Sequence, residues 1–175
     1  MKISSLLTVA SLVWLGSSLF AESRQDNRFT PHIDVLQKAL DKKEPDLLLS
    51  QMIEQEHRAH LFSLEALLRV YGNKYPEELE SFLSSSIKPF EDELGRWVDS
   101  KEAVDFAQNI GASQKVISYL QGREENERQA FLRFLDNNHF RGRDASRSPL
   151  RKLSEALEEV DWQGKGADRR GFPFT

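Results

Sequence analysis

Residues 46–71 read DLLLSQMIEQEHRAHLFSLEALLRVY, and this stretch decides the fold class. Its apolar side chains recur at steps of three and four residues, the spacing of one face of an α-helix. The face comprises Leu49, Ile53, His57, His60 or Leu61, Leu64, Leu68 and Tyr71. We therefore predict one long amphipathic helix over this stretch, which Gly72 is well placed to end.

Helical periodicity continues on both sides of this stretch. Proline at a first helical position, in Thr30-Pro31, Tyr75-Pro76 and Ser148-Pro149, marks three helix starts. Further helices are expected over residues 31–43, 76–98 with a break or kink at Pro89, 101–110 after a cap at Asp99-Ser100, 113–137 and 149–160. No stretch shows the two-residue alternation of a half-buried strand. The sequence thus predicts an all-α, single-domain bundle of about five to seven helices.

The N-terminus has the pattern of a secretory signal peptide. Residues 1–21 carry one charge, Lys2, followed by an apolar run of about ten residues, which is too short to span a bilayer. We expect cleavage after Ala21, with cleavage after Ser18 as the alternative. A cysteine-free chain does not use the disulfides of small eukaryotic secreted domains, so we expect export to a bacterial periplasm or to the extracellular space.

The predicted organisation has four parts. These are a signal peptide over residues 1–21, a loose leader over 22–31, a helical domain over 32–162 and a disordered tail over 163–175. The mature chain has no second apolar run of membrane-spanning length. Loss of Lys2 with the signal peptide changes the net charge from −4 to −5, which argues against nucleic acid as a partner.

A basic segment before the last helix is the leading candidate binding site. Residues 139–152 carry five cationic side chains against Asp144, namely Arg141, Arg143, Arg147, Arg151 and Lys152. Arginine suits phosphate and carboxylate groups, and the free N–H groups of the helix that starts at Ser148 favour anions. We predict a site for a small anion, or for an acidic protein or envelope component. The alternative is a solvated loop whose arginines pair with acids of other helices.

The opposite charge gathers in residues 77–93. Six acidic side chains there face only Lys88, namely Glu77, Glu78, Glu80, Glu91, Asp92 and Glu93. The pattern allows this acidic patch to meet the basic segment within one chain or between two copies. A homodimer is therefore among the partners that the sequence allows.

A divalent metal ion is the alternative ligand. Glu54, His57 and His60 lie on one predicted helix, and the Glu-x-x-His spacing puts a carboxylate and an imidazole on one face. Carboxylate-bridged di-metal bundles use this motif on two helices, whereas this chain has it once. The three side chains suffice for a single ion, or they lie solvated at the edge of the apolar face. Our leading interpretation includes no cofactor.

Recognisable catalytic motifs are missing from the sequence. It has no cysteine, no Gly-x-Ser-x-Gly turn, no Walker-type loop and no His-Glu-x-x-His motif. We interpret the chain as a non-enzymatic binding protein. An enzyme of another type stays open, because fold does not decide function.

The stretch from His57 to Ala107 resembles part of a CHAD domain, the conserved-histidine α-helical family. The resemblance rests on His57, on the helix that continues into Leu67-Leu68-Arg69, and on Leu94-Gly95-Arg96-Trp97-Val98-Asp99, which is similar to the Leu-Gly-x-x-x-Asp segment of that family. It implies a helical bundle that binds polyphosphate, with four positions to test: His57, His60, Arg69 and Arg96. The chain departs from the family in its acidic charge, its shorter length and the absence of arginines directly after His60.

Overall fold

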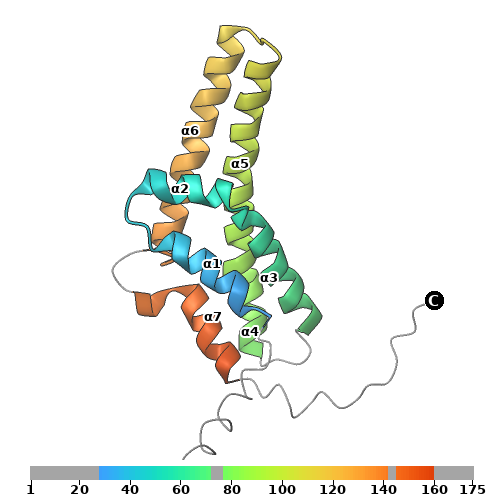
Figure 1. The fold of residues 1–175 in the computed structure, drawn as a ribbon, viewed down its shortest axis with the longest axis vertical. Helices are drawn as coiled ribbons and strands as arrows, with labels where there is room; N and C mark the ends of the chain where they lie inside the picture. Colours follow the sequence, from blue (N-terminus) through green and yellow to red (C-terminus); the bar gives the residue numbers. More distant parts are fainter. Residues whose placement is uncertain (1–27, 72–76, 142–144, 160–175) are drawn as a thin grey trace, which may run out of the picture.

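The computed structural model describes residues 28–71, 77–141 and 145–159. Over these ranges every regular element is helical, which confirms the predicted all-α bundle (Figure 1). The elements are α1 (Thr30–Leu40), α2 (Pro45–Glu54), α3 (His57–Tyr71), α4 (Glu77–Phe82), the π-helical turn η2 (Leu83–Ile87), α5 (Lys88–Asn109), α6 (Gln114–Asn137), the 3₁₀ turn η3 (Ala145–Arg147) and α7 (Pro149–Glu158). None of the helices in these ranges is long and apolar enough to cross a membrane. The predicted signal peptide and tail lie outside the described residues.

The helix predicted over residues 46–71 is two helices, so this prediction is wrong in one respect. α2 ends at Glu54, and Glu56 has a φ of 49°, in the left-handed region that breaks a helix. α3 then leaves in a new direction (Figure 1). The turn places His57 at the first position of α3, with its side chain fully buried.

Residues 77–109 form a single helical run, contrary to the break expected at Asp99-Ser100. The Ser100 hydroxyl donates to the Trp97 carbonyl at 2.7 Å, a bond within the helix rather than a cap. Pro89 lies just after η2, where the helix widens by one residue. The widened turn accommodates a proline, which cannot donate a helical hydrogen bond.

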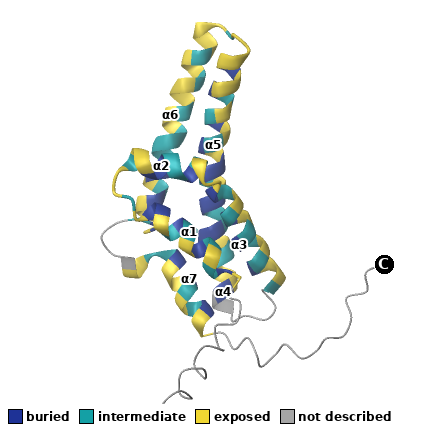
Figure 2. Cartoon of the chain, in the orientation of Figure 1, coloured by how far each residue is buried: buried dark blue, intermediate teal, exposed yellow. Residues whose placement is uncertain are grey.

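The core fills the space between α1, α2, α3, α7 and the lower halves of α5 and α6 (Figure 2). Its centre is aromatic: the Phe90 ring lies 4.6 Å from Phe140 and 5.9 Å from Phe131, centroid to centroid. Trp97 stacks on Phe131, with ring centroids 5.8 Å apart. Phe29 is 1% exposed and belongs to this core, and α1 begins at Thr30, so both lie within the range expected for the leader.

α5 and α6 form a long hairpin that projects beyond the other helices (Figure 1). The connection turns at Gly111, whose φ of 66° suits a residue without a Cβ. The hairpin is held at its base by the Trp97 indole, which donates to Glu124 at 2.9 Å. Arg128 bonds Asp46 at the N-terminus of α2 at 3.2 Å. Beyond these contacts the distal hairpin, residues 101–123, extends away from the core (Figure 2).

Candidate functional site

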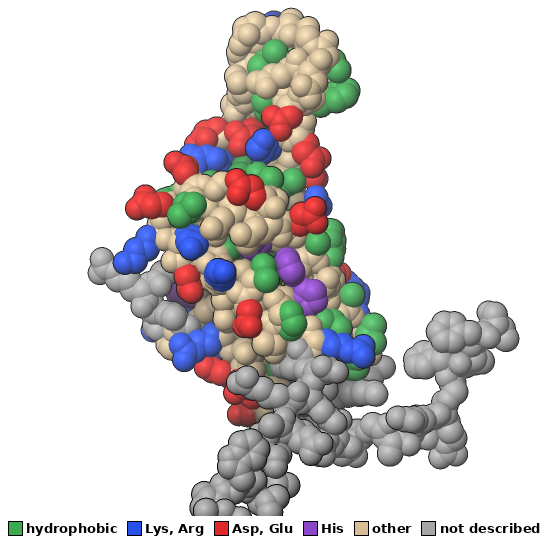
Figure 3. Space-filling view, in the orientation of Figure 1, with side chains coloured by type: hydrophobic (Ala, Val, Ile, Leu, Met, Phe, Trp, Pro, Cys, Tyr) green, Lys and Arg blue, Asp and Glu red, His purple; other side chains and the backbone are tan. Residues whose placement is uncertain are grey.

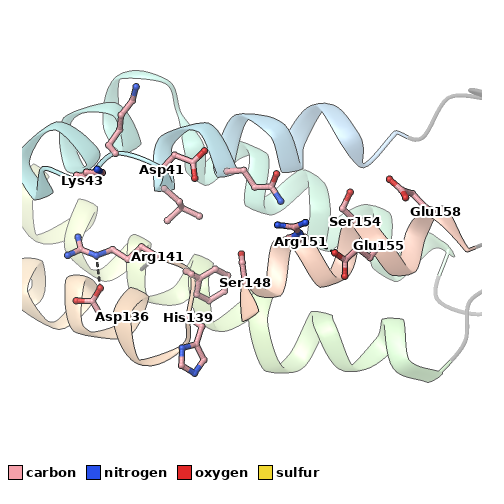
Figure 4. A pocket seen from close by; sticks show the side chains of 14 residues that line it. Asp41, Lys43, Asp136, His139, Arg141, Ser148, Arg151, Ser154, Glu155 and Glu158 are labelled. Carbon is pink, nitrogen blue, oxygen red and sulfur yellow. Dashed lines mark hydrogen bonds and ion pairs between the residues drawn. The ribbon is translucent and has the colours of Figure 1, made fainter. Parts of the chain in front are cut away.

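The predicted basic site borders a pocket of about 980 Å³ between the C-terminal ends of α1 and α6 and the length of α7 (Figure 4). Arg141 and Arg151 both line it. Two further cations, Lys42 and Lys43, come from the segment after α1, which sequence reasoning did not single out. Arg147 lies exposed on η3 and Lys152 lies exposed on α7, while Arg143 is outside the described residues.

Acidic side chains of the same pocket balance its cations. The Arg141 Nε donates to Asp136 at 2.6 Å, and the Arg151 Nε donates to Glu155 at 3.1 Å. Asp41 and Glu158 add two more carboxylates to the lining. The Arg141 Nη1 is buried and makes no hydrogen bond within the described residues, so one donor of this guanidinium is left unsatisfied. The pocket can therefore take an anion, provided that the ligand competes with these carboxylates.

Within the acidic patch, Glu91 pairs with cations that lie outside the predicted basic segment. Glu91 is 2% exposed and accepts hydrogen bonds from Arg58 at 3.0 Å and from Lys88 at 2.6 Å. Arg58 also donates to Asp99 at 2.9 Å, so its guanidinium lies over Gly95, midway between the two carboxylates on α5. The hydrogen bonds that Lys88 donates to Asp92 and Glu91 raise the pKa of Lys88. This cluster fastens α3 to α5 and is structural.

Three of the four histidines lie together where α1 meets α3. The Nδ1 atoms of His32 and His60 are 2.9 Å apart, and the ring of His57 lies 6.1 Å from that of His60. Burial lowers the pKa of His57, and nearby backbone groups offset this only in part; neither of its ring nitrogens makes a hydrogen bond of good geometry. Burial and the neighbouring His60 lower the pKa of His32. Sequence reasoning did not connect His32 with this cluster.

The predicted metal trio is only partly assembled. His57 and His60 are neighbours, whereas Glu54 is exposed at the last position of α2. In the described part of the chain, no three or more His, Asp or Glu side chains are arranged to hold one ion.

The positions implied by the CHAD-like resemblance already have partners or are buried. Arg69 donates to Glu65 at 2.7 Å, and Arg96 pairs with Glu93. His57 is buried behind His60. A phosphate chain would have to displace the two glutamates, and polyphosphate binding stays a prediction of the resemblance.

The distal hairpin carries an apolar surface that sequence reasoning did not single out. Phe106 and Ile110 on α5 are 65% and 63% exposed, and Val116 and Tyr119 on α6 are 45% and 72% exposed. A phenylalanine or tyrosine side chain offers roughly 150–250 Å², so the two rings alone present on the order of 250 Å² to solvent. The largest apolar patch of a typical monomeric protein is a few hundred Å² and is often functional, so this surface is a candidate interaction site. We call these four residues the hairpin patch.

The hairpin patch is almost free of charge. Residues 106–122 contain one charged side chain, Lys115, although 30% of the whole chain is charged. Figure 3 shows hydrophobic and uncharged atoms at the projecting end, above a belt of acidic and basic side chains. This local loss of charge is the signal in the sequence that would have pointed to the surface.

Few residues are buried between the two helices of the distal hairpin. Val104 and Ala107 are its buried residues on α5, and the buried residues of α6 all lie near its other end, at Phe131, Leu132 and Leu135. Four large apolar side chains of the distal hairpin therefore stay exposed, where another surface can bury them: Phe106, Ile110, Val116 and Tyr119.

A comparison of the chain with protein-family models, curated proteins and solved structures finds no match, so the site is interpreted from its own geometry.

Proposed function

We propose that this protein is an exported, non-enzymatic helical interaction protein, and that it binds through the hairpin patch. The observation that carries the proposal is the exposure of Phe106, Ile110, Val116 and Tyr119 on a hairpin that projects from a well-packed body. Exposure of an apolar helical surface to water is unfavourable, and burial of that surface on binding is favourable.

The partner that fits this surface best is a second copy of the chain. Two helical hairpins that face each other form a four-helix bundle, which buries the apolar side of both. A two-fold interface brings identical patches together, so a charged patch would repel itself. Lys115 is the one charged residue between Phe106 and Gly122, so two hairpin patches can meet with little repulsion.

Sedimentation analysis of the mature chain tests the proposal. We expect a monomer–dimer equilibrium over micromolar concentrations. Ile110→Glu should weaken it by about tenfold or more, because each dimer would bury two unpaired carboxylates. Val70→Glu is the matched control, since Val70 on α3 is 73% exposed and lies outside the patch.

Two outcomes would contradict the proposal. One is a monomer at every concentration, including a monomer that binds phospholipid vesicles through the hairpin, which would assign the patch to a lipid surface. The other is a dimer that Ile110→Glu leaves unchanged.

Export is a separate element of the proposal. The apolar run of residues 6–15 and the small residues before Glu22 support it. Intact mass measurement on protein from the envelope fraction should give a chain that begins at Glu22. A chain that begins at Leu19 would place cleavage after Ser18, and a full-length cytoplasmic chain would contradict export.

Small-anion binding in the pocket of Arg141 and Arg151 is the second candidate function. The buried, unpartnered Nη1 of Arg141 favours it, and the neighbouring carboxylates oppose it. Titration with inorganic phosphate, followed by NMR, should shift signals of the pocket in the natural chain. Arg141→Gln should abolish the shifts, whereas Arg133→Gln, at an exposed position of α6 outside the pocket, should not.

A further inference from the structure

His32 and His60 approach each other more closely than two histidines need for packing. Their Nδ1 atoms are 2.9 Å apart and their ring centroids 5.2 Å apart, and the residues come from α1 and α3. Both side chains are partly exposed, and histidine atoms reach the surface on this face of the molecule (Figure 3). An ion in solution can therefore reach the pair.

This geometry suits a shared ion. A zinc–nitrogen bond is about 2.0–2.1 Å long, so two nitrogens on one tetrahedral ion lie roughly 3.3 Å apart. The two Nδ1 atoms would need to separate by only a few tenths of an ångström. Without a metal, one of the two imidazoles must donate a proton to the other, so the pair holds one proton between two nitrogens.

We propose that His32 and His60 form a binding site for one divalent transition-metal ion, Zn²⁺ or Cu²⁺, which fastens α1 to α3. Imidazole nitrogen is a preferred ligand of both ions. Water completes the coordination, because no third His, Asp or Glu of the described chain converges on the pair. The site differs from the Glu54, His57 and His60 trio, since His57 is buried behind His60 and Glu54 is not required.

The histidine content of the chain supplies a matched control. The chain has four histidines, and His139, just after the C-terminal end of α6, is exposed and is not part of the ring contacts that join the other three. A His139→Gln variant therefore removes an exposed imidazole without touching the pair.

Calorimetric titration of the untagged, metal-free mature protein with ZnCl₂ and CuCl₂ tests the proposal. We expect about one ion per chain, with the Kd raised about tenfold or more by His32→Gln and by His60→Gln. His139→Gln and Glu54→Gln should leave the Kd unchanged. Circular dichroism should show that the variants keep their helix content, since both histidines are partly exposed.

NMR on the natural protein gives a readout that needs no variant. Zinc should shift or broaden the imidazole signals of His32 and His60 and leave those of His139 unchanged. The proposal would be overturned by the absence of binding, by equal Kd values for the natural chain and His32→Gln, or by a Kd that responds to Glu54→Gln and not to His32→Gln.

Discussion

The two halves of the α5–α6 hairpin make different use of the same helical pattern. In the lower half Phe90, Leu94 and Phe131 are buried to 0% exposure, under α1, α2 and α3. In the distal half Phe106 and Tyr119 are more than 60% exposed, although they sit on the same two helices. The difference lies in the neighbours, because helices of the body cover one half and leave the other open. An apolar residue on a helix therefore predicts burial, but it does not indicate whether the same chain or a partner provides the covering surface.

The largest expected difference between the two halves is in the free energy of unfolding that is lost when one aromatic ring is removed from each. Phe131→Ala should lower the free energy of unfolding by about 3–5 kcal/mol, because it leaves a cavity in the aromatic core. Phe106→Ala should change it by no more than about 0.5 kcal/mol in the monomer. Urea denaturation at low protein concentration measures both values. Equal losses would mean that the distal half has a core of its own.

A smaller loss of stability is expected from removal of the ion pair that links α3 to the lower half of α5. Arg58→Ala should cost about 1–3 kcal/mol, because the buried Glu91 carboxylate loses one of its two cations. Arg96→Ala is the control, since its pair with Glu93 lies near the surface and should contribute about 0–1 kcal/mol. The comparison fails if both variants unfold at the same urea concentration.

Two glycines give the next contrast. An alanine Cβ at Gly122, in the distal half, would meet no atom within 4 Å, so Gly122→Ala should stabilise the helix by about 0.5–1 kcal/mol. At Gly95, in the lower half, the Cβ would lie 2.7 Å from the Arg58 Nη2, which two carboxylates hold in place. Gly95→Ala should therefore bring no gain and should reduce the effect of Arg58→Ala. Thermal unfolding of the single and double variants measures this coupling.

The smallest effect concerns acid stability at the boundary between the halves. Hydrogen bonds from Arg128 and then Gln129 lower the pKa of Glu125 to about 2. A carboxylate with a lowered pKa stabilises the fold above its unfolded pKa, and this contribution fades as the pH falls from about 4.5 towards 2. Glu125→Gln should be slightly less stable than the natural chain at pH 5 and equal to it near pH 2. A difference that persists at pH 2 would assign the effect to packing.

Local signals in the sequence predict much of the fold. The proline-marked starts of α1 and α7 and the full length of α6 follow from residues within each helix. The break at Gln55–Glu56 carries no glycine or proline, so no local signal in the sequence predicts the left-handed φ of Glu56. Ser100 was misread because serine bonds to backbone both at caps and inside helices.

Candidate sites were harder to predict, because they depend on contacts between distant residues. The four predicted cations that the structure describes do not form one cluster: Arg141 and Arg151 line a pocket, whereas Arg147 and Lys152 do not line it. His32 and His60 are separated by 28 residues, and no spacing rule connects them. The hairpin patch could have been inferred in part, since the weakly charged stretch around Gly111 is visible in the sequence.

The π-helical turn between α4 and α5 also bears on how this chain tolerates insertions and deletions. A π turn holds one residue more than an α turn, and one residue corresponds to about 100° of helix rotation. The side chains of Ser84 and Ser85 both bond the Ser81 carbonyl there and face solvent, so neither fills the core. Deletion of one of them would restore a plain α-helix and turn α4 about its axis relative to α5. Leu79, now 1% exposed, would rotate out of the core. This short segment therefore determines which face of α4 points to the core when α5 is packed in its place.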